Sequence, residues 1–301
     1  MHGLDRAAAP SAAKAKEMLD EVGGSWWNVY IGGPSSGGSG WTPALLEEYR
    51  AHGIRRFLLT YVGRQDKQVH LLTANQGRKD GVDACQIAAR FGYHEGTPIC
   101  LDLEQRTFEA APSGSLDYVC AWCDAVRAQG LRPGLYANRP ALVAVASRAN
   151  RPDWVWVASW IGHSVDPGLH PHRIRHLDDG LWSEAGQRAW QYAGAFKENG
   201  VLKACRVGGF DVDINVADSE CLAGEAGPPQ PKLPSHLEED DMFTFSSPGQ
   251  PTFFVAGGRA VGLNELSDLQ AIQAALKPAS LPDLALDADT FQAFVRAFRA
   301  D

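Results

Sequence analysis

The feature that most constrains the fold is an alternation that runs to about residue 216. Short apolar runs rich in β-branched and aromatic residues alternate with segments of helical periodicity, which is typical of βα units around a parallel sheet. The strands predicted in this way are 2–5, 27–31, 56–62, 98–103, 133–136, 154–159, 188–192 and a last one that ends near Asp213. The helices predicted between them, several of which begin at a proline or a small polar residue, are 12–21, 43–52, 84–91, 116–129 and 140–148.

Eight strands with intervening helices fit a closed barrel of about 250 residues or somewhat fewer. We therefore predict an α/β fold, a (β/α)8 TIM-like barrel, over residues 1–222. A doubly wound open sheet is the alternative, but it requires a glycine-rich phosphate-binding turn after the first strand. Asp5-Arg6-Ala7-Ala8 stands there instead. Segment 161–184 has few apolar residues, and we expect it to be a long loop before the seventh strand.

Residues 223–240 have the composition of a linker, with prolines, glycines and acidic residues but few residues that build a core. Beyond them we predict a small α+β module over residues 241–301. About sixty residues form only a marginal core, so this module is expected to dock or to oligomerise. Its predicted elements are a hairpin, a third strand and two amphipathic helices: 242–246, 252–256, 259–263, 264–276 and 287–299.

The charge of the chain disfavours nucleic acid as a partner. The net charge is -8, with 36 acidic against 28 basic residues, and no run of lysine or arginine could neutralise a row of phosphates. No segment approaches the ~20 continuous apolar residues of a membrane span, so we expect no membrane insertion. Because Met1 stands directly before the first predicted strand, we also expect no signal peptide.

The cysteines and histidines do not form a recognisable metal site. The 6 cysteines are too sparse for a disulfide scaffold and are expected to be small core residues. Cys120 and Cys123 form a C-x-x-C, but it lies in an apolar helical run without a second pair or nearby histidines. We therefore expect neither a metal nor another cofactor. Four histidines lie in the polar loop and are expected to be solvated: His163, His170, His172 and His176.

Acidic residues stand at the ends of three predicted strands. Asp5 ends the first, Asp102 and Glu104 the fourth, and Asp211 and Asp213 the eighth. Catalytic residues of parallel barrels gather at the carboxyl ends of the strands, so we expect these acids to share one mouth. The side-chain period of two places Asp102 and Glu104 on one face, with Cα atoms roughly 6 to 7 Å apart. Crowding raises the pKa of at least one carboxyl, which is how glycosidases hold a protonated acid near neutral pH.

Each acid also has a structural interpretation, since an aspartate at a strand end, such as Asp5, commonly caps the next helix. Inward-pointing Asp102 and Glu104 would be costly without a function, because charges are rarely buried unpaired. Aromatic and amide side chains at other strand ends suit pyranose rings, although packing against loops is the alternative for each. The side chains predicted to bind substrate are Tyr61, Tyr136, Trp160, Gln191, Tyr192 and Asp211.

Several short motifs recur in a characteristic order along the predicted barrel. They are Gly3-Leu4-Asp5, Leu101-Asp102-Leu103-Glu104, Gly134-Leu135-Tyr136-Ala137-Asn138, Trp156-Val157-Ala158-Ser159-Trp160, Trp190-Gln191-Tyr192 and Val212-Asp213-Ile214-Asn215. In this order they resemble the family 25 glycoside hydrolases and, more closely, the related glycoside-hydrolase-like domains of actinobacteria and their phages. The resemblance covers residues 1 to about 216.

The resemblance implies N-acetylmuramidase activity on the glycan strands of peptidoglycan. It assigns Glu104 as general acid, with Asp102, Asp5 and Asp213 holding charge and orientation around the reacting sugar. The stretch from Trp26 to Gly33 and the glycine- and serine-rich loop up to Gly40 depart from the muramidases and are closer to the hydrolase-like relatives. For these hydrolase-like relatives, the resemblance implies a binding pocket more securely than it implies a catalysed reaction.

The C-terminal segment resembles modules of proteins from phages that infect actinobacteria, through Pro251-Thr252-Phe253-Phe254-Val255 and Gly257-Gly258. This resemblance implies other phage tail proteins as partners of residues 241–301. The expected location is then the virion tail, or the host cytoplasm before release. The main hypothesis is a peptidoglycan hydrolase. The alternatives are a catalytically silent structural or wall-binding component of a phage tail, and an intracellular carbohydrate enzyme.

Overall fold

A computed structural model gives the structure of the chain, which divides into two compact units, Met1–Ala226 and Gly227–Asp301. The residues that the structure describes are 1–37, 40–162, 164–166, 168, 182–184, 186–194, 196–198, 201–203, 205–224, 243–246, 252–256, 259–263 and 283–285. The expected loop histidines, most of the 223–240 linker and the helices expected at 264–276 and 287–299 lie outside the described residues.

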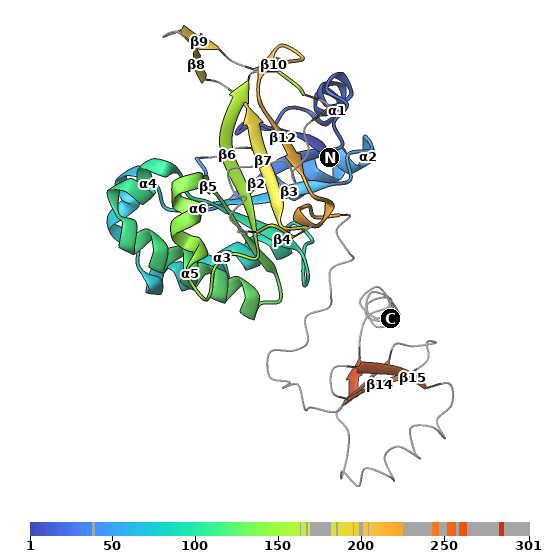
Figure 1. The fold of residues 1–301 in the computed structure, drawn as a ribbon. Helices are drawn as coiled ribbons and strands as arrows, with labels where there is room; N and C mark the ends of the chain where they lie inside the picture. Colours follow the sequence, from blue (N-terminus) through green and yellow to red (C-terminus); the bar gives the residue numbers. More distant parts are fainter. Residues whose placement is uncertain are drawn as a thin grey trace. The chain divides into compact units, whose positions relative to one another are not determined.

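The first unit is a closed barrel of eight strands in the order β1-β12-β7-β6-β5-β4-β3-β2 (Figure 1). This confirms the predicted barrel. Its strands are β1 His2–Asp5, β2 Trp26–Gly32, β3 Phe57–Val62, β4 Pro98–Asp102, β5 Arg132–Asn138, β6 Trp154–Gly162, β7 Arg188–Ala193 and β12 Asp213–Ala217. The α-helices described in this unit are α1 Ala12–Glu21, α2 Pro43–Ala51, α3 Ala74–Arg90, α4 Gln105–Ala110, α5 Pro112–Ala128 and α6 Arg139–Ala146.

The eighth barrel strand differs from the prediction, because β12 begins at Asp213 rather than ending there. It runs antiparallel to both of its neighbours, β1 and β7. The reversal follows a hairpin of β10 (Arg206–Val207) and β11 (Phe210–Asp211), whose turn residues Gly208 and Gly209 have positive φ angles. The amino end of β12 therefore lies beside the carboxyl end of β1, where Asp213 pairs with Asp5.

Side-chain caps fix where the principal helices start. Ser11, Thr42, Thr73 and Asn138 each precede a helix, and each side chain accepts a hydrogen bond from the backbone amide three residues on. These four helices therefore begin at the residue directly after the cap.

Helix α3 begins ten residues before the predicted start at residue 84. Glycines at 77 and 81 weaken the helical pattern of this segment, because glycine is a poor helix former. In the structure they allow α3 to approach α5 closely. A Cβ atom on Gly77 would lie 2.3 Å from the carbonyl oxygen of Tyr118, and one on Gly81 would lie 2.8 Å from that of Trp122.

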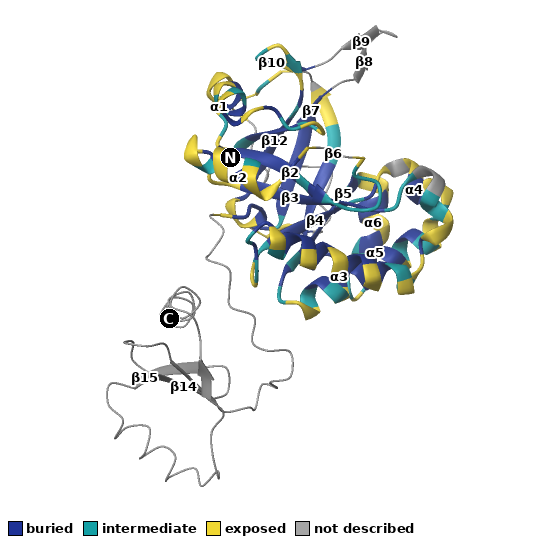
Figure 2. Ribbon diagram, turned by 180° about the vertical axis from the view of Figure 1, so that it is seen from behind, coloured by how far each residue is buried: buried dark blue, intermediate teal, exposed yellow. Residues whose placement is uncertain are grey.

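The interior of the barrel is apolar at one end and polar at the other. Trp26 and Trp154 fill the apolar end, where inward-facing Gly3 and Gly134 leave room for the indole rings. A Cβ atom at either glycine would lie 2.1 to 2.2 Å from a ring atom. A larger apolar layer packs between the strands and the helices, which expose only their outer faces (Figure 2). One end of the barrel is thus closed, and the polar end is left for a site.

The second unit contains a four-stranded sheet in the order β15-β14-β13-β16. Its strands are β13 Phe243–Ser246, β14 Thr252–Ala256, β15 Arg259–Leu263 and β16 Asp283–Ala285. β13, β14 and β15 pair in antiparallel fashion, and β16 is parallel to β13. Among the helices of the described residues, none has the length and apolarity that a membrane crossing requires.

Candidate active site

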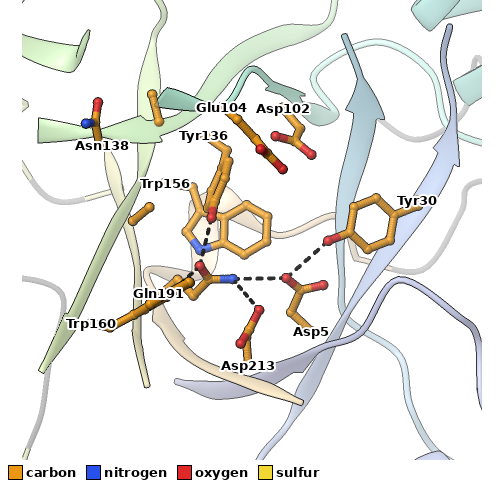
Figure 3. A pocket seen from close by; sticks show the side chains of 12 residues that line it. Asp5, Tyr30, Asp102, Glu104, Tyr136, Asn138, Trp156, Trp160, Gln191 and Asp213 are labelled. Carbon is orange, nitrogen blue, oxygen red and sulfur yellow. Dashed lines mark hydrogen bonds between the residues drawn. The ribbon is translucent and has the colours of Figure 1, made fainter. Parts of the chain in front are cut away.

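A pocket of about 460 Å³ opens at the polar end of the barrel (Figure 3). Its walls come from seven strands and from the residues that follow them. The lining residues are Asp5, Tyr30, Asp102, Glu104, Tyr136, Ala137, Asn138, Trp156, Ala158, Trp160, Gln191 and Asp213. The four residues predicted to be catalytic therefore meet in one pocket, together with the predicted substrate-binding residues Tyr136, Trp160 and Gln191.

Asp5 is buried at the end of β1 and points into the pocket. Its Oδ1 accepts a hydrogen bond from Asn28 Nδ2 at 2.9 Å, and its Oδ2 accepts from Tyr30 Oη at 3.2 Å and from Gln191 Nε2 at 3.1 Å. Burial raises the pKa of Asp5 to about 6, and these hydrogen bonds limit the rise. Ser11, not Asp5, caps the following helix α1.

Asp102 ends β4, and its surroundings favour the protonated carboxyl. Burial is the largest cause that raises its pKa to about 8, and the negative charges of Glu104 and Asp5 add to it. Its buried Oδ1 has no hydrogen-bond partner among the described residues. At neutral pH this carboxyl is therefore mostly an uncharged acid that can donate a hydrogen bond into the pocket.

Glu104 is the exposed member of the acidic group. It stands two residues after Asp102 and is the residue that precedes α4. Figure 3 shows the two carboxyl groups on the same side of the pocket, across from Asp5 and Asp213. The pocket thus combines the half-buried Asp102, the exposed Glu104 and an opposing acidic pair.

Gln191 of β7 connects the opposing acids to the aromatic wall of the pocket. Its Nε2 donates to Asp5 Oδ2 and to Asp213 Oδ2, both at 3.1 Å. Its Oε1 accepts from Tyr136 Oη at 2.8 Å and from Trp160 Nε1 at 2.9 Å. A primary amide has two donors and two acceptor lone pairs, so these four bonds use its full capacity. Gln191 therefore positions the acids rather than offering a free amide to a ligand.

We expect Gln191→Glu to lower the free energy of unfolding at pH 7 by about 2–4 kcal/mol. The variant keeps the shape of the side chain and the acceptor for Tyr136 and Trp160, but it replaces both donors with a third carboxyl group. The loss should be smaller at pH 5, where the acidic cluster retains more protons. Urea unfolding at both pH values measures it, with exposed Gln86→Glu on α3 as the control. Equal stability of the two variants at pH 7 would contradict the role of Gln191.

Three residues predicted to bind substrate do not line the pocket. Tyr61 points out of the barrel, donates to Asp83 Oδ2 at 3.0 Å and packs near Trp122. Tyr192 also points outward, because it follows the inward-facing Gln191, and its hydroxyl lies 3.1 Å from His2 Nδ1. Asp211 belongs to the hairpin before β12 and pairs with Arg206 at 3.2 Å, with both side chains 68% exposed. The expectation that these three face the mouth is wrong.

Some pocket residues were not among the predicted site residues. Tyr30 contacts Asp5, and Trp156 donates through Nε1 to Asn215 Oδ1 at 3.0 Å while its ring packs against Tyr136 at 4.7 Å. Trp156 and Trp160 lie four positions apart in β6, so the period of two places both on the face that carries the pocket. That spacing is the signal by which Trp156 could have been found.

The loop after β3 contacts the backbone at the end of β4. Gln65 Nε2 donates to the backbone carbonyl of Asp102 at 3.4 Å. Its neighbour Arg64 is held by Asp80 of α3, which accepts from Arg64 Nε at 2.7 Å and from Tyr118 Oη at 2.7 Å. This partly buried ion pair holds the loop against α3. Among the described residues, no group of three or more His, Cys, Asp or Glu side chains is arranged to hold a metal ion.

A comparison with known protein families finds one match over most of the first unit. The sequence profile of the Rv2525c-like, glycoside hydrolase-like domain matches residues 20–217. No curated protein sequence matches the chain significantly.

Solved structures that match this chain include an uncharacterised protein of B. stearothermophilus, with 18% identity and a TM-score of 0.49; the match covers 74% of this chain and 100% of the B. stearothermophilus chain. The Tat-secreted protein Rv2525c of Mycobacterium tuberculosis, in complex with L-tartrate, has 16% identity and a TM-score of 0.47. The match covers 72% of this chain and 94% of the Rv2525c chain. The catalytic domain of an endolysin from a bacteriophage of Listeria monocytogenes has 17% identity and a TM-score of 0.43. The match covers 73% of this chain and 94% of the endolysin domain.

Proposed function

The chain belongs to the family of Rv2525c-like, glycoside hydrolase-like domains, and from this premise we propose that its barrel hydrolyses glycosidic bonds in the glycan strands of peptidoglycan. The observation that carries the proposal is the convergence of Asp5, Asp102, Glu104 and Asp213 on one pocket. Glycoside hydrolysis requires a proton donor on one side of the scissile bond and negative charge that stabilises an oxocarbenium-like transition state. An acidic pocket with separate carboxyl groups can supply both.

In the proposed reaction Glu104 protonates the glycosidic oxygen as the leaving sugar departs. Its exposed position at the pocket rim allows it to exchange protons with water between turnovers. A carboxylate, or the acetamido group of the substrate itself, supports the positive charge that develops on the anomeric carbon. Water then completes the hydrolysis. Asp102, held as an uncharged acid, would donate a hydrogen bond to the sugar or to its acetamido oxygen.

The aromatic side chains of the pocket suit a sugar ring. Trp160 is 46% exposed although its Nε1 is bonded to Gln191, so part of its indole ring is available to a ligand. Tyr136 and Trp156 form an edge-to-face pair deeper in the pocket. We propose that Trp160 stacks on a pyranose ring at the entrance, while the polar groups below orient it.

Product analysis of digested walls tests the proposed reaction. Purified actinobacterial cell walls are incubated with the protein, and the soluble products are identified by mass spectrometry. Muramidase-type cleavage is expected to release fragments that end in reducing N-acetylmuramic acid. Fragments with other new ends would indicate a different bond, and the absence of any new reducing end would exclude hydrolysis of this substrate.

A second candidate function is wall binding without cleavage, as a component of a phage tail. The second compact unit, Gly227–Asp301, favours it, because a separate unit with its own sheet is suited to attachment. The protein would then be located in the virion and would contact other tail proteins through residues 241–301. Sedimentation with purified walls, without release of soluble sugar, would support this function. A free, monomeric and lytic protein would exclude it.

A further inference from the structure

A small apolar groove lies beside the acidic pocket. It has a volume of about 230 Å³ and is lined by Phe108 of α4, Leu116 of α5, and Pro140, Ala141 and Ala144 of α6, among others. Of the described residues that line it, only Asn138 and Glu109 carry polar side chains. Sites that enclose a whole small-molecule ligand occupy about 300–1,000 Å³. The size of the groove therefore suits one apolar substituent of a larger ligand.

The groove and the acidic pocket adjoin each other at one residue, Asn138. Asn138 lines both of them and stands at the end of β5, between pocket residue Tyr136 and helix α6. Glu104, which lines the acidic pocket, precedes α4, and Phe108, which lines the groove, follows it after one helical turn. A ligand bound next to Glu104 can therefore extend a side group into the groove without leaving the surface of the barrel.

Asn138 offers a hydrogen-bond donor where the two cavities meet. Its Oδ1 accepts the backbone amide of Ala141 at 3.3 Å, which fixes the orientation of the side-chain amide. Its Nδ2 donates to none of the residues that the structure describes. The junction thus combines an amide donor with an apolar cavity, which is complementary to a carbonyl group followed by a small hydrocarbon side chain.

We propose that the groove binds the lactyl-peptide arm of a peptidoglycan strand. Asn138 Nδ2 donates to a carbonyl oxygen of the arm, and the side chain of the arm's alanine residue lies in the groove. This inference rests on the proposed function and specifies its substrate as a peptide-bearing glycan rather than a bare one. A further sugar ring fits less well, because its hydroxyl groups would lose water without finding partners on these apolar walls.

Calorimetric binding of two soluble ligands to the full chain tests the proposal without requiring turnover. One ligand is the disaccharide of N-acetylglucosamine and N-acetylmuramic acid, and the other is the same disaccharide carrying L-alanyl-D-isoglutamine. We expect the peptide-bearing ligand to bind about tenfold more tightly, from one buried methyl group and one hydrogen bond.

Two substitutions on α6 test whether the preference for the peptide-bearing ligand arises in the groove. Ala144→Trp fills the groove from an exposed position and should abolish the tenfold difference while retaining the affinity for the bare disaccharide. The matched control is Val143→Trp, at a 40% exposed position that does not line the groove, and it should keep the difference. Asn138→Asp keeps the helix-capping oxygen but removes the donor, and it should reduce the difference about threefold.

Equal affinity of the wild-type protein for the two ligands, or binding of neither, would overturn the proposal. A preference that survives Ala144→Trp would also overturn it, because the peptide would then bind elsewhere. Failure of the proposed function is a separate outcome. If cell walls are not cleaved but the preference is present and is lost in Ala144→Trp, hydrolysis is excluded and the groove remains a binding site for the peptide arm.

Discussion

Glu104→Gln is expected to lower kcat for the hydrolysis of cell walls by at least about 100-fold, the usual contribution of a general acid. Glutamine retains the size and hydrogen-bonding capacity of the side chain but cannot give up a proton to the glycosidic oxygen. Because Glu104 is exposed and its negative charge repels the Asp102 carboxylate, its replacement should leave the barrel at least as stable as before. Release of reducing sugar from purified walls measures the rate, and thermal unfolding measures the stability.

The control for this substitution is Glu48→Gln, which removes one exposed carboxylate from α2, outside the pocket. The control should retain the wild-type rate, which separates the chemistry of Glu104 from the loss of one negative charge. The KM of the Glu104→Gln variant should change little, because the carboxyl group acts mainly in the transition state. Equal rates for wild type and Glu104→Gln would remove Glu104 from the mechanism.

The acidic side of the pocket could be predicted because parallel strands place their carboxyl ends at one edge. Asp5 and Asp102 are strand-end residues in the sequence, and they remain so in the structure. The barrel itself follows from the alternation of strands and helices, for which eight strands leave few arrangements. These inferences depend on the direction of the chain and on the spacing of its apolar residues, and both can be read from a single sequence.

Which face a side chain occupies could not be predicted as well. β3 and β7 are buried on both faces, so the residues that point inward and outward are similarly apolar. Tyr61 therefore carries no signal that separates it from pocket residues, whereas the period of two shows only that Gln191 and Tyr192 cannot share one face. Gln191 is recognisable as a polar residue within an apolar strand, but its four hydrogen-bond partners come from four other strands.

The direction of β12 could not be predicted from the sequence pattern either. An apolar strand has the same periodicity in either direction, and here the Gly208-Gly209 turn reverses the chain before the strand begins. Asp213 nevertheless reaches the mouth, because the first residue of an antiparallel strand lies beside the last residues of its neighbours. The predicted location of Asp213 therefore agrees with the structure although the predicted strand direction was wrong.

Asp102→Asn is expected to stabilise the barrel at pH 8 by about 2–4 kcal/mol while it lowers activity. The pKa of Asp102 is raised from 3.8 to about 8, mainly by burial. The folded protein therefore holds a proton that the unfolded chain releases between these two values. Stability from this group is fully present below about pH 4 and is lost as the pH rises toward 8. Asparagine imitates the uncharged acid at every pH, so it escapes this loss.

Urea unfolding at pH 4, 6 and 8 measures the effect. The difference between Asp102→Asn and wild type should be near zero at pH 4 and should grow with pH, whereas exposed Asp20→Asn on α1 should stay within about 0.5 kcal/mol of wild type throughout. Asp5, whose pKa is raised to about 6, weakens both proteins between pH 4 and 6 and so contributes little to the difference. Stability curves that run parallel across this range would mean that Asp102 is ionised in the folded state. A gain in stability together with lost activity would show that the pocket retains a destabilising acid because its chemistry requires one.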